Sequence, residues 1–450
     1  DLHSFPTRRS SDLVVGVAFH TLGCKVNQYE TEAIREQFAR AGHEIIEEDG
    51  SADVYIINTC TVTNLADRKS RQFIRKAKKN NRDAVIAVTG CYAQTNPGEV
   101  SRIDGVEIII GTNEKNNILR KVEEYMMDRG RTVMVKDYAE LTEYEELGVI
   151  EAMDSRSRAF VKIEDGCDRF CSYCVIPFAR GKVRSRSEKD ILTEVRSLLA
   201  KGYGEIVLTG INTALYGKER GGLEVLDLLK KIDEIRGDFR VRLSSLEPTV
   251  INAEYVKRLL DCKKLCHHLH LSVQSGSNKI LREMNRRYNR DDYLRIVETL
   301  REFDGSYGIT TDIIVGFPGE TEEEFLDSVR IIEESRFSRV HAFKYSERRG
   351  TPAAARTDKV DGETKNERIR RLMETAEKER EAFNRRSIGT VSKVLAERNE
   401  SGYVTGYSDN YTKVYIDEDD FGERELSGFY LVKLLKTYKD GMIGEVVRKP

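Results

Sequence analysis

Three cysteines stand close together in the middle of the chain. Cys167, Cys171 and Cys174 lie in the string CDRFCSYC, a C-x3-C-x2-C run directly after a β-rich segment. Three thiolates on one short loop can converge on a metal centre, but a structural zinc ion and a cubane of four irons each take four ligands. The loop has no fourth cysteine or histidine. The spacing therefore favours an iron–sulfur cluster with one open iron, and zinc is the alternative.

A second set of cysteines follows three successive β-rich runs nearer the N-terminus. Cys24 ends AFHTLGC, Cys60 ends YIINTC and Cys91 ends IAVTGC. In an open parallel sheet, ligands bind outside the carboxyl ends of the strands, so we expect these three thiols to meet at one point. A single cysteine of this kind is more often a buried, inert side chain, but the shared position favours a second open-site cluster.

The elements that must position these cysteines divide the chain into segments. Residues 14–138 alternate β-rich runs with helical stretches, which predicts an open parallel α/β sheet. Residues 139–158 read as a linker, and residues 1–13 are set aside as a non-domain segment. Residues 159–386 contain six strand–helix units, typical of a partial (βα)6 barrel, and end in a charged helix. Short strands with turn residues in 387–450 predict a small antiparallel β-barrel.

The composition excludes several classes of protein. The 450 residues are 39% hydrophobic and 33% charged, and no apolar run is long enough to span a membrane. The eight cysteines occur without a secretory signal, which favours metal binding or catalysis over disulfides. We therefore expect a soluble, cytoplasmic protein with no membrane partner. Its net charge of −2 means that any nucleic-acid contact must be local.

The cysteine strings resemble those of a known enzyme superfamily. The C-x3-C-x2-C spacing with an aromatic residue, Tyr173, before the last cysteine resembles the radical S-adenosylmethionine superfamily. The wider string GCDRFCSYCVIPFARGKVRSR is similar to its methylthiotransferase branch. The resemblance extends through TLGCKVNQYET, NTCTVTNLADRKSR and TGCYAQ, and covers the chain from Val14 onward. It also implies that the C-terminal barrel is a TRAM-like domain.

This resemblance implies a reaction. The Cys167 triplet would hold a 4Fe–4S cluster that binds S-adenosylmethionine and yields a 5′-deoxyadenosyl radical, and the Cys24 triplet would hold a second 4Fe–4S cluster that carries the sulfur. No catalytic residue beyond the cluster ligands is expected. The substrate would be N6-threonylcarbamoyladenosine at position 37, in the anticodon stem-loop of tRNA, and the reaction needs an electron donor and a sulfur source.

Other functions are compatible with the same sequence. The isopentenyladenosine branch of the same family is the nearest, and the branch that modifies an aspartate of a ribosomal protein is another. A different class is a non-catalytic iron–sulfur or zinc protein that binds RNA through its C-terminal barrel. The chemistry of any bound metal and of modified tRNA nucleosides separates these readings.

Residues near the ends of the barrel strands are candidates for binding the cofactor, since such folds carry function there. Besides Tyr173, these are polar or small residues that strand-end packing would equally explain: Thr209, Gly210, Asn212, Ser245, Ser272, Gln274 and Asp312. The string LREMNRRY adds three arginines that can pair with a carboxylate, with a phosphate, or only with solvent: Arg282, Arg286 and Arg287.

Positive charge concentrates beside the cysteine loops, where RNA phosphates would be held. The candidate RNA-binding residues come from two basic runs: Arg68, Lys69, Arg71 and Arg75, and Arg180, Lys182, Arg184 and Arg186. A solvated charged face is the alternative. The C-terminal segment has nine basic and eleven acidic residues from position 388 onward. Its charge does not favour RNA, and its Tyr403, Tyr407 and Tyr411 can stack on bases or pack the barrel.

The string DCKKLCHHLHL imitates a metal site. It contains Cys262, Cys266, His267, His268 and His270. The alternation of His268 and His270 with leucines indicates a strand, so we interpret this cluster as core and strand packing rather than as ligands.

Overall fold

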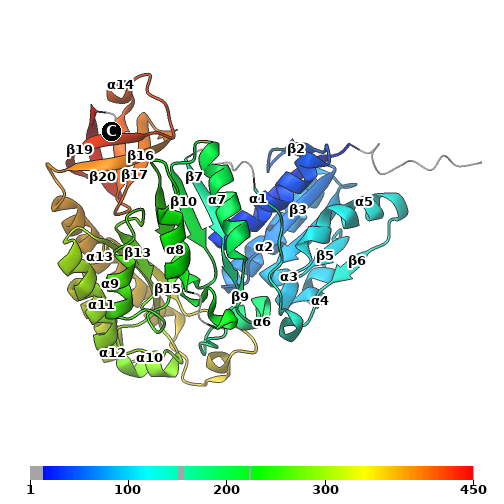
Figure 1. Ribbon diagram of the computed structural model, residues 1–450. Coiled ribbons are helices and arrows are strands. Elements are labelled where there is room, and N and C mark those ends of the chain that lie inside the picture. Colours follow the sequence, from blue (N-terminus) through cyan, green and yellow to red (C-terminus); the bar gives the residue numbers. More distant parts are fainter. Residues whose placement is uncertain (1–13, 151–156, 222–223, 449–450) are drawn as a thin grey trace, which may run out of the picture. The chain divides into compact units, whose positions relative to one another are not determined.

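The computed structural model describes residues 14–150, 157–221 and 224–448, which form two compact units (Figure 1). Unit 1 contains the residues up to position 151 together with Val175–Lys182, and unit 2 contains Ala152–Cys174 and Val183–Pro450. The segment 1–13 and part of the expected linker lie outside the described residues. No helix among the described residues is long and apolar enough to cross a membrane.

Unit 1 is a six-stranded parallel sheet with helices on both faces. Its strand order is β2-β1-β3-β4-β5-β6. The strands are β1 (Gly16–Thr21), β2 (Glu44–Ile46), β3 (Val54–Thr59), β4 (Val85–Gly90), β5 (Ile108–Ile110) and β6 (Thr132–Met134). All residues of β3 and β4 are buried, as expected for central strands covered on both sides. The open parallel sheet that the sequence predicts is confirmed.

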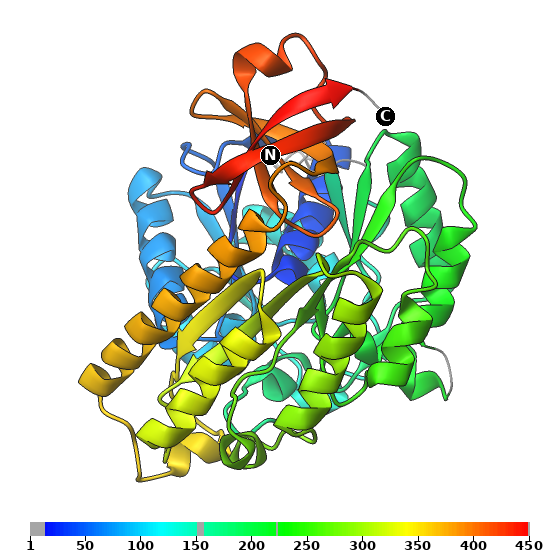
Figure 2. The ribbon, with the colours of Figure 1, turned by 90° about the vertical axis from the view of Figure 1, so that its left-hand side faces the viewer.

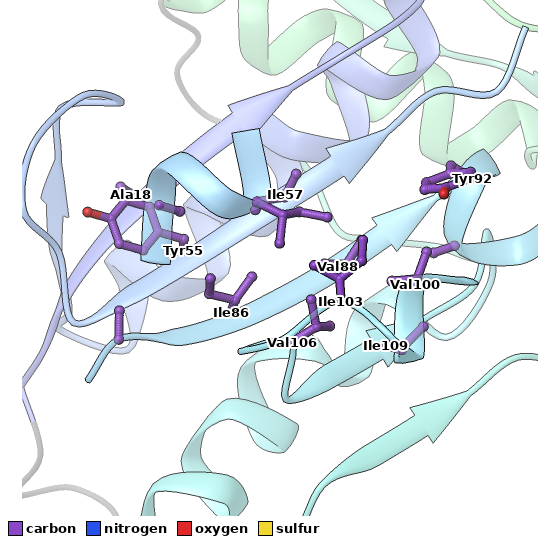
Figure 3. Packing of buried hydrophobic residues seen from close by; sticks show 14 of the residues in the cluster. Ala18, Tyr55, Ile57, Ile86, Val88, Tyr92, Val100, Ile103, Val106 and Ile109 are labelled. Carbon is purple, nitrogen blue, oxygen red and sulfur yellow. The ribbon is translucent and has the colours of Figure 1, made fainter. Parts of the chain in front are cut away.

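Two separate apolar cores hold the helices of unit 1 to the sheet. One core joins the sheet to α1 (Lys25–Arg40) and α5 (Ile118–Asp128). The other joins the opposite face to α2 (Asn64–Asn80), α3 (Cys91–Thr95) and α4 (Pro97–Ser101), and Figure 3 shows its side chains packed along the strands. The alternation of side chains along each strand feeds both cores, which fixes the register of the sheet.

Unit 2 begins with a partial barrel of parallel strands. β7 (Arg158–Lys162), β10 (Glu205–Thr209) and β11 (Arg240–Leu243) form one sheet, in the order β11-β10-β7. A second sheet has the order β12-β13-β14-β15, with bounds Ser245–Leu246, His268–Leu271, Gly308–Val315 and Arg339–Lys344. β11 and β12 are parts of one strand path interrupted at Ser244. Six strand positions result, which confirms the expected partial (βα)6 barrel.

Helices cover the outer side of this partial barrel (Figure 1). They are α7 (Glu188–Ala200), α8 (Val225–Asp233), α9 (Ala253–Leu259), α11 (Arg290–Phe303), α12 (Glu322–Ser335) and α13 (Gly362–Arg385). The short helix α10 (Asn278–Glu283) follows β13, and β8 (Glu164–Asp165) pairs with β9 (Arg184–Ser185). The short helix α6 (Ile176–Arg180), which follows the cysteine loop in the sequence, belongs to unit 1. The charged helix expected at the end of this region is α13, which packs on β15.

The C-terminal strands close into a five-stranded barrel (Figure 2). They are β16 (Val391–Glu400), β17 (Tyr403–Ser408), β18 (Lys413–Asp417), β19 (Phe429–Tyr438) and β20 (Gly441–Arg448), with α14 (Glu418–Phe421) between β18 and β19. Four strand pairs are antiparallel and β18–β20 is parallel, because a closed ring with an odd number of strands cannot alternate throughout.

A buried carboxylate anchors this barrel within unit 2. Glu205 accepts hydrogen bonds from Arg240 Nε at 2.6 Å and Arg242 Nε at 2.8 Å, and Arg242 also donates to the backbone oxygen of Asp409 at 3.1 Å. Of the tyrosines considered for base stacking, Tyr407 packs against the Arg158 guanidinium, and Tyr411 against that of Arg242. These two rings therefore pack the barrel.

Candidate metal centres

The three cysteines of unit 1 lie at the carboxyl ends of neighbouring strands. Cys24 caps α1 after β1, Cys60 follows β3, and Cys91 starts α3 after β4. Because β1, β3 and β4 are adjacent in the sheet, the three thiols are gathered at one edge. Burial raises the pKa of Cys60 to about 12, and the nearby Cys91 and Cys24 thiols add to the rise. Burial also raises the pKa of Cys91.

Two glycines allow the loops that carry Cys24, Cys60 and Cys91 to approach one another and form a cradle. Gly23 has φ +115°, and a Cβ there would lie 3.1 Å from Cys60 Sγ. Gly90 has φ +96°, and a Cβ there would collide with the backbone oxygen of Thr59. A side chain at either position would be strained and would push into the space between the cysteine loops. The loops therefore approach more closely than any other residue type permits.

Asn27 ties the loops around the cysteines together. Its Nδ2 donates to the backbone oxygens of Leu22 at 2.7 Å and of Thr59 at 3.1 Å, so it joins the loop before Cys24 to the strand end before Cys60. Its Oδ1 accepts a hydrogen bond from Arg180 Nη2 at 2.7 Å. Both groups of this amide are thus used to fix the cradle.

A fully buried group of charges lies beside the same cysteines. Arg180 Nη1 is 2.9 Å from Glu30 Oε1, and Lys115 Nζ is 3.2 Å from Glu30 Oε2. The side chains of Arg180 and Glu30 have no exposed surface. Arg180 also hydrogen-bonds to Cys91, and its charge opposes the effect of burial on the pKa of that thiol. These three side chains together carry one net positive charge, which favours sulfur ligands in their anionic form.

The structure corrects the prediction of RNA contact for three arginines. Arg180 is paired with Glu30, Arg184 lies 3.6 Å from Asp165 with 3% of its surface exposed, and Arg186 is paired with Glu194 with neither side chain exposed. A buried guanidinium that is paired with a carboxylate is not offered to phosphate. The sequence shows only that these residues are basic, and their carboxylate partners become neighbours only in the folded chain.

The other candidate RNA-binding residues differ among themselves. Arg68, Lys69 and Arg75 are exposed on α2, and Lys182 is exposed as well. Arg71 is half-buried and donates to the Tyr92 hydroxyl at 2.9 Å.

The second cysteine triplet lies on the loop after β8 in unit 2. Cys171 is buried, and Cys167 and Cys174 are half-buried. The loop is held from α10 and the residues after it, because Ser172 Oγ donates to the Glu283 backbone oxygen at 2.7 Å and Asn285 Nδ2 donates to the Phe170 backbone oxygen at 3.0 Å. Burial raises the pKa of Cys167, and the nearby Cys174 and Cys171 thiols add to the rise. The three thiols therefore lie within electrostatic reach of one another.

An arginine contacts this triplet directly. Arg286 Nη1 donates to Cys171 Sγ at 3.3 Å, and Nη2 donates to the backbone oxygen of Ser272 at 3.1 Å. Glu247 lies 3.7 Å from Arg286 and 2.8 Å from Arg169. Of the three arginines considered in LREMNRRY, Arg286 is thus the one that supports the cysteine loop.

The residues proposed to bind the cofactor lie near the carboxyl ends of the barrel strands. Ser272 Oγ donates to Asp312 Oδ2 at 2.8 Å, and the backbone N–H of Gln274 donates to the backbone oxygen of Asp312 at 2.8 Å. Asn212 Nδ2 donates to Glu247 at 3.4 Å, so it adjoins the residues around Arg286. The remaining candidates flank these groups: Tyr173 is half-buried, Thr209 ends β10, Gly210 packs on Glu164, and Ser245 starts β12.

The cysteines and histidines near β13 are buried or contact neighbouring side chains. Cys262 and Cys266 are buried, His268 Nε2 lies 3.0 Å from Thr310 Oγ1, and His267 Nδ1 lies 2.8 Å from Asp304. Among the described residues, no group of three or more histidine, cysteine, aspartate or glutamate side chains is arranged for a single metal ion. The packing interpretation fits these contacts.

Several residues of the site escape sequence reasoning. Asn27 and Glu30 follow Cys24 at positions three and six, which places them near one face of α1, so helical spacing is a signal for them. Lys115 and Glu247 have no such signal, since only the folded chain brings them to Glu30 and Arg286.

Family models match the two parts of the chain that carry the cysteine triplets. Residues 161–332 match the Radical SAM superfamily, and residues 16–111 match Uncharacterized protein family UPF0004. Threonylcarbamoyladenosine tRNA methylthiotransferase MtaB of Bacillus subtilis (strain 168) is 42% identical over 441 residues, which cover 96% of this chain and 97% of that protein. The protein of the same name from Thermotoga maritima is 39% identical over 95% of this chain and 96% of its own length.

The chain is also similar to a relative with a related name and to a solved structure of low sequence identity. The tRNA-2-methylthio-N(6)-dimethylallyladenosine synthase of Clostridium tetani is 34% identical over 95% of each chain. The radical S-adenosylmethionine methyltransferase TsrM of Kitasatospora setae, solved with cobalamin and a [4Fe-4S] cluster, has a TM-score of 0.56 at 15% identity and covers 76% of this chain and 74% of its own, which shows a shared fold. Superfamily membership implies S-adenosylmethionine and a 4Fe–4S cluster. This chain therefore belongs to the radical S-adenosylmethionine methylthiotransferase family of tRNA-modifying enzymes.

Proposed function

We propose that this enzyme adds a methylthio group to C2 of N6-threonylcarbamoyladenosine at position 37 of tRNA. The observation that carries the proposal is the pair of cysteine triplets near the carboxyl ends of parallel strands, in a chain 42% identical to a methylthiotransferase named for that nucleoside. Acid–base side chains do not remove hydrogen from C2 of adenine, so a cofactor must supply that step.

Each triplet suits a 4Fe–4S cluster. The donors are three thiols, and three thiolates leave one iron of a cubane for an external ligand. Cys167, Cys171 and Cys174 would hold the cluster that binds S-adenosylmethionine, and the triplet of unit 1 would hold a second. When bound, these groups supply the one-electron cleavage of S-adenosylmethionine and a site for the sulfur to be transferred. The buried thiols must lose their protons when iron binds. Burial raises their pKa and so disfavours this loss, and binding to iron must offset that free energy.

The chain's own residues hold the sulfur ligands in place. Arg286 directs one N–H to Cys171 and another to the backbone after β13, so the ligand sulfur and the strand end keep a fixed separation. Arg180 and Asn27 act similarly on the unit 1 loops. Positive charge beside the thiolates also stabilises the negative charge that a cluster bound by thiolates carries.

The proposed RNA contacts use exposed basic side chains only. Arg68, Lys69, Arg75 and Lys182 would bind phosphates of the anticodon stem-loop, so the affinity for the stem-loop should fall as the salt concentration rises. The reaction also requires an electron donor and a source of sulfur, which are further partners of the enzyme.

An anaerobic reconstitution experiment tests the proposal. We expect about eight irons per chain, formation of 5′-deoxyadenosine on reduction, and 2-methylthio-N6-threonylcarbamoyladenosine in stem-loops that carry the threonylcarbamoyl group. Cys171→Ser should lower iron binding by about half and abolish cleavage of S-adenosylmethionine, because one of the three ligands to that cluster is lost. Cys262→Ser is the matched control, since Cys262 is buried but lies outside both triplets. Normal cleavage by Cys171→Ser would refute the assignment.

The isopentenyladenosine activity is the second candidate, because a tRNA-2-methylthio-N(6)-dimethylallyladenosine synthase, named for the same five-carbon N6 substituent, is 34% identical over 95% of this chain. Mass spectrometry of nucleosides from stem-loops with either substituent decides between them. Methylthiolation of the isopentenyl nucleoside alone would overturn the proposed substrate and leave the enzyme class unchanged.

A further inference from the structure

One face of the partial barrel in unit 2 carries aromatic and polar side chains next to Ser272 and Asp312, two of the residues proposed to bind the cofactor. His270 on β13 pairs in register with Thr310 on β14, and Asp312 on β14 pairs with His341 on β15. Side chains two residues apart on a strand share a face, so Phe343 lies on the same side as His341. The rings of His270 and His341 lie 5.9 Å apart, which agrees with this register. We call His270, Ser272, Asp312, His341 and Phe343 the β13–β15 face.

A short chain of contacts joins this face to the second cysteine triplet. Arg286 donates to Cys171 Sγ at 3.3 Å and to the Ser272 backbone oxygen at 3.1 Å. Ser272 Oγ then donates to Asp312 Oδ2 at 2.8 Å. Three hydrogen bonds therefore lead from a ligand sulfur to the centre of the face. A group bound on the face lies near the place where S-adenosylmethionine chemistry would occur.

The polar groups at the centre of the face are already fixed. His270 Nε2 lies 3.0 Å from Asp312 Oδ2, and His270 Nδ1 lies 2.9 Å from Thr310 Oγ1. The Asp312 carboxylate thus accepts hydrogen bonds from both His270 and Ser272. These bonds orient the residues before any ligand binds, and a binding surface is expected to be preorganised in this way.

The edge strand β15 carries aromatic side chains that are accessible to solvent. Phe343 is 44% exposed and His341 is exposed, whereas Val340 on the opposite side of the same strand is buried. An exposed phenylalanine ring beside an imidazole offers a flat apolar surface with an N–H donor at its margin. Nucleobases stack on such rings, and each stacked base contributes about 1–3 kcal/mol.

We propose that the β13–β15 face receives the modified adenine of the RNA substrate, with Phe343 stacked on the base and His341 donating to the carboxylate of the threonylcarbamoyl group. This inference rests on the proposed function. An adenine needs a flat apolar surface, and the anionic substituent needs a hydrogen-bond donor, whereas an isopentenyl group would need neither charge nor donor. The base would leave its stack in the stem-loop to reach the face.

Binding of labelled anticodon stem-loops to the reconstituted enzyme tests this. The two probes carry either N6-threonylcarbamoyladenosine or plain adenosine at position 37, and fluorescence anisotropy is measured at one salt concentration. The unsubstituted enzyme should prefer the modified probe. His341→Leu should lower that preference about tenfold through loss of a hydrogen bond to a charged group. Phe343→Leu should weaken both probes about tenfold and leave their ratio unchanged.

Two matched variants control for unspecific effects. His267→Leu and Phe303→Leu change the same residue types at solvent-accessible positions of unit 2 outside the face, and both should bind like the unsubstituted enzyme to within about twofold. The inference is overturned if the enzyme shows no preference between the probes, or if His341→Leu keeps that preference. Failure of the proposed function is separate, because it appears as absence of the methylthiolated nucleoside in turnover by the unsubstituted enzyme.

Discussion

The buried charges beside the unit 1 cysteines predict that removing Glu30 and removing Arg180 destabilise unit 1 by different amounts. Glu30 supplies the carboxylate that Arg180 and Lys115 share, and the two cations lie 2.9 Å and 3.2 Å from it. Glu30→Gln removes the carboxylate charge and leaves the two buried cations facing a neutral amide. Breaking one buried pair in this way costs about 3–5 kcal/mol. We expect the substitution to destabilise unit 1 by at least that amount.

Arg180→Met should cost less, although it changes the larger side chain. Glu30 would still be paired with Lys115 at 3.2 Å, so its carboxylate would keep a cation beside it. The loss would be limited to the hydrogen bonds that Arg180 makes to charged and polar groups, about 1–3 kcal/mol. The order of the two effects therefore reports the net charge of the group.

Hydrogen exchange of the α1 amides measures this in the full-length protein, without assuming that the two units unfold together. Glu30→Gln should lower the protection of Lys25–Arg40 at least about a hundredfold, and Arg180→Met by less. Glu36→Gln is the control, because Glu36 pairs with Arg40 across one turn at the surface of the same helix, and such pairs contribute only about 0.3–0.5 kcal/mol. If Arg180→Met lowered protection as much as Glu30→Gln, the electrostatic reasoning would be wrong.

Three further predictions concern the backbone, pH and the barrel. Gly90→Ala should prevent cluster assembly in unit 1, whereas Gly42→Ala, with positive φ but open space around it, should cost only about 1 kcal/mol; equal iron content in both would contradict this. Burial raises the pKa of Glu320 to about 7, so folding favours the protonated form of this side chain. The unfolding free energy of the unsubstituted protein, measured relative to that of Glu320→Gln, should therefore fall by about 1–3 kcal/mol between about pH 5 and pH 8. A difference that stays constant with pH would refute this. Glu205→Gln should increase hydrogen exchange in β16–β20 by removing the charge that two buried arginines share, and unchanged exchange there would argue against the anchor.

The architecture could be predicted from the sequence because its signals are local. Continuous apolar runs such as those of β3 and β4 indicate strands covered on both faces, and the alternation with helical segments indicates parallel pairing. Cysteines at the ends of such runs could be placed without coordinates, since the carboxyl ends of parallel strands share one edge. The short strands β2, β5 and β6 carry too few residues to give a pattern, so they escaped prediction.

The assignment of charged side chains could not be predicted in the same way. The string RGKVRSR contains Arg180, Arg184 and Arg186, and a basic string of this kind is equally compatible with a charged surface and with buried, paired side chains. The carboxylate partner of Arg180 is 150 positions away in sequence, and that of Arg186 is 8 positions away. Pairing over such varied separations depends on the packed tertiary structure, which no local pattern encodes.

This ambiguity bears on how basic residues beside cysteine motifs should be interpreted. A guanidinium that is exposed can bind phosphate, whereas one that is buried next to thiols holds loops together and offsets the negative charge of thiolate ligands. Arg68 and Arg180 both lie close to cysteines in the sequence, yet only Arg68 is exposed. Replacing Arg68 with alanine should therefore weaken stem-loop binding and flatten its salt dependence while leaving iron content unchanged, whereas replacing Arg180 with methionine should lower iron content in unit 1. Equal effects of the two substitutions on both measurements would show that burial does not separate the two roles.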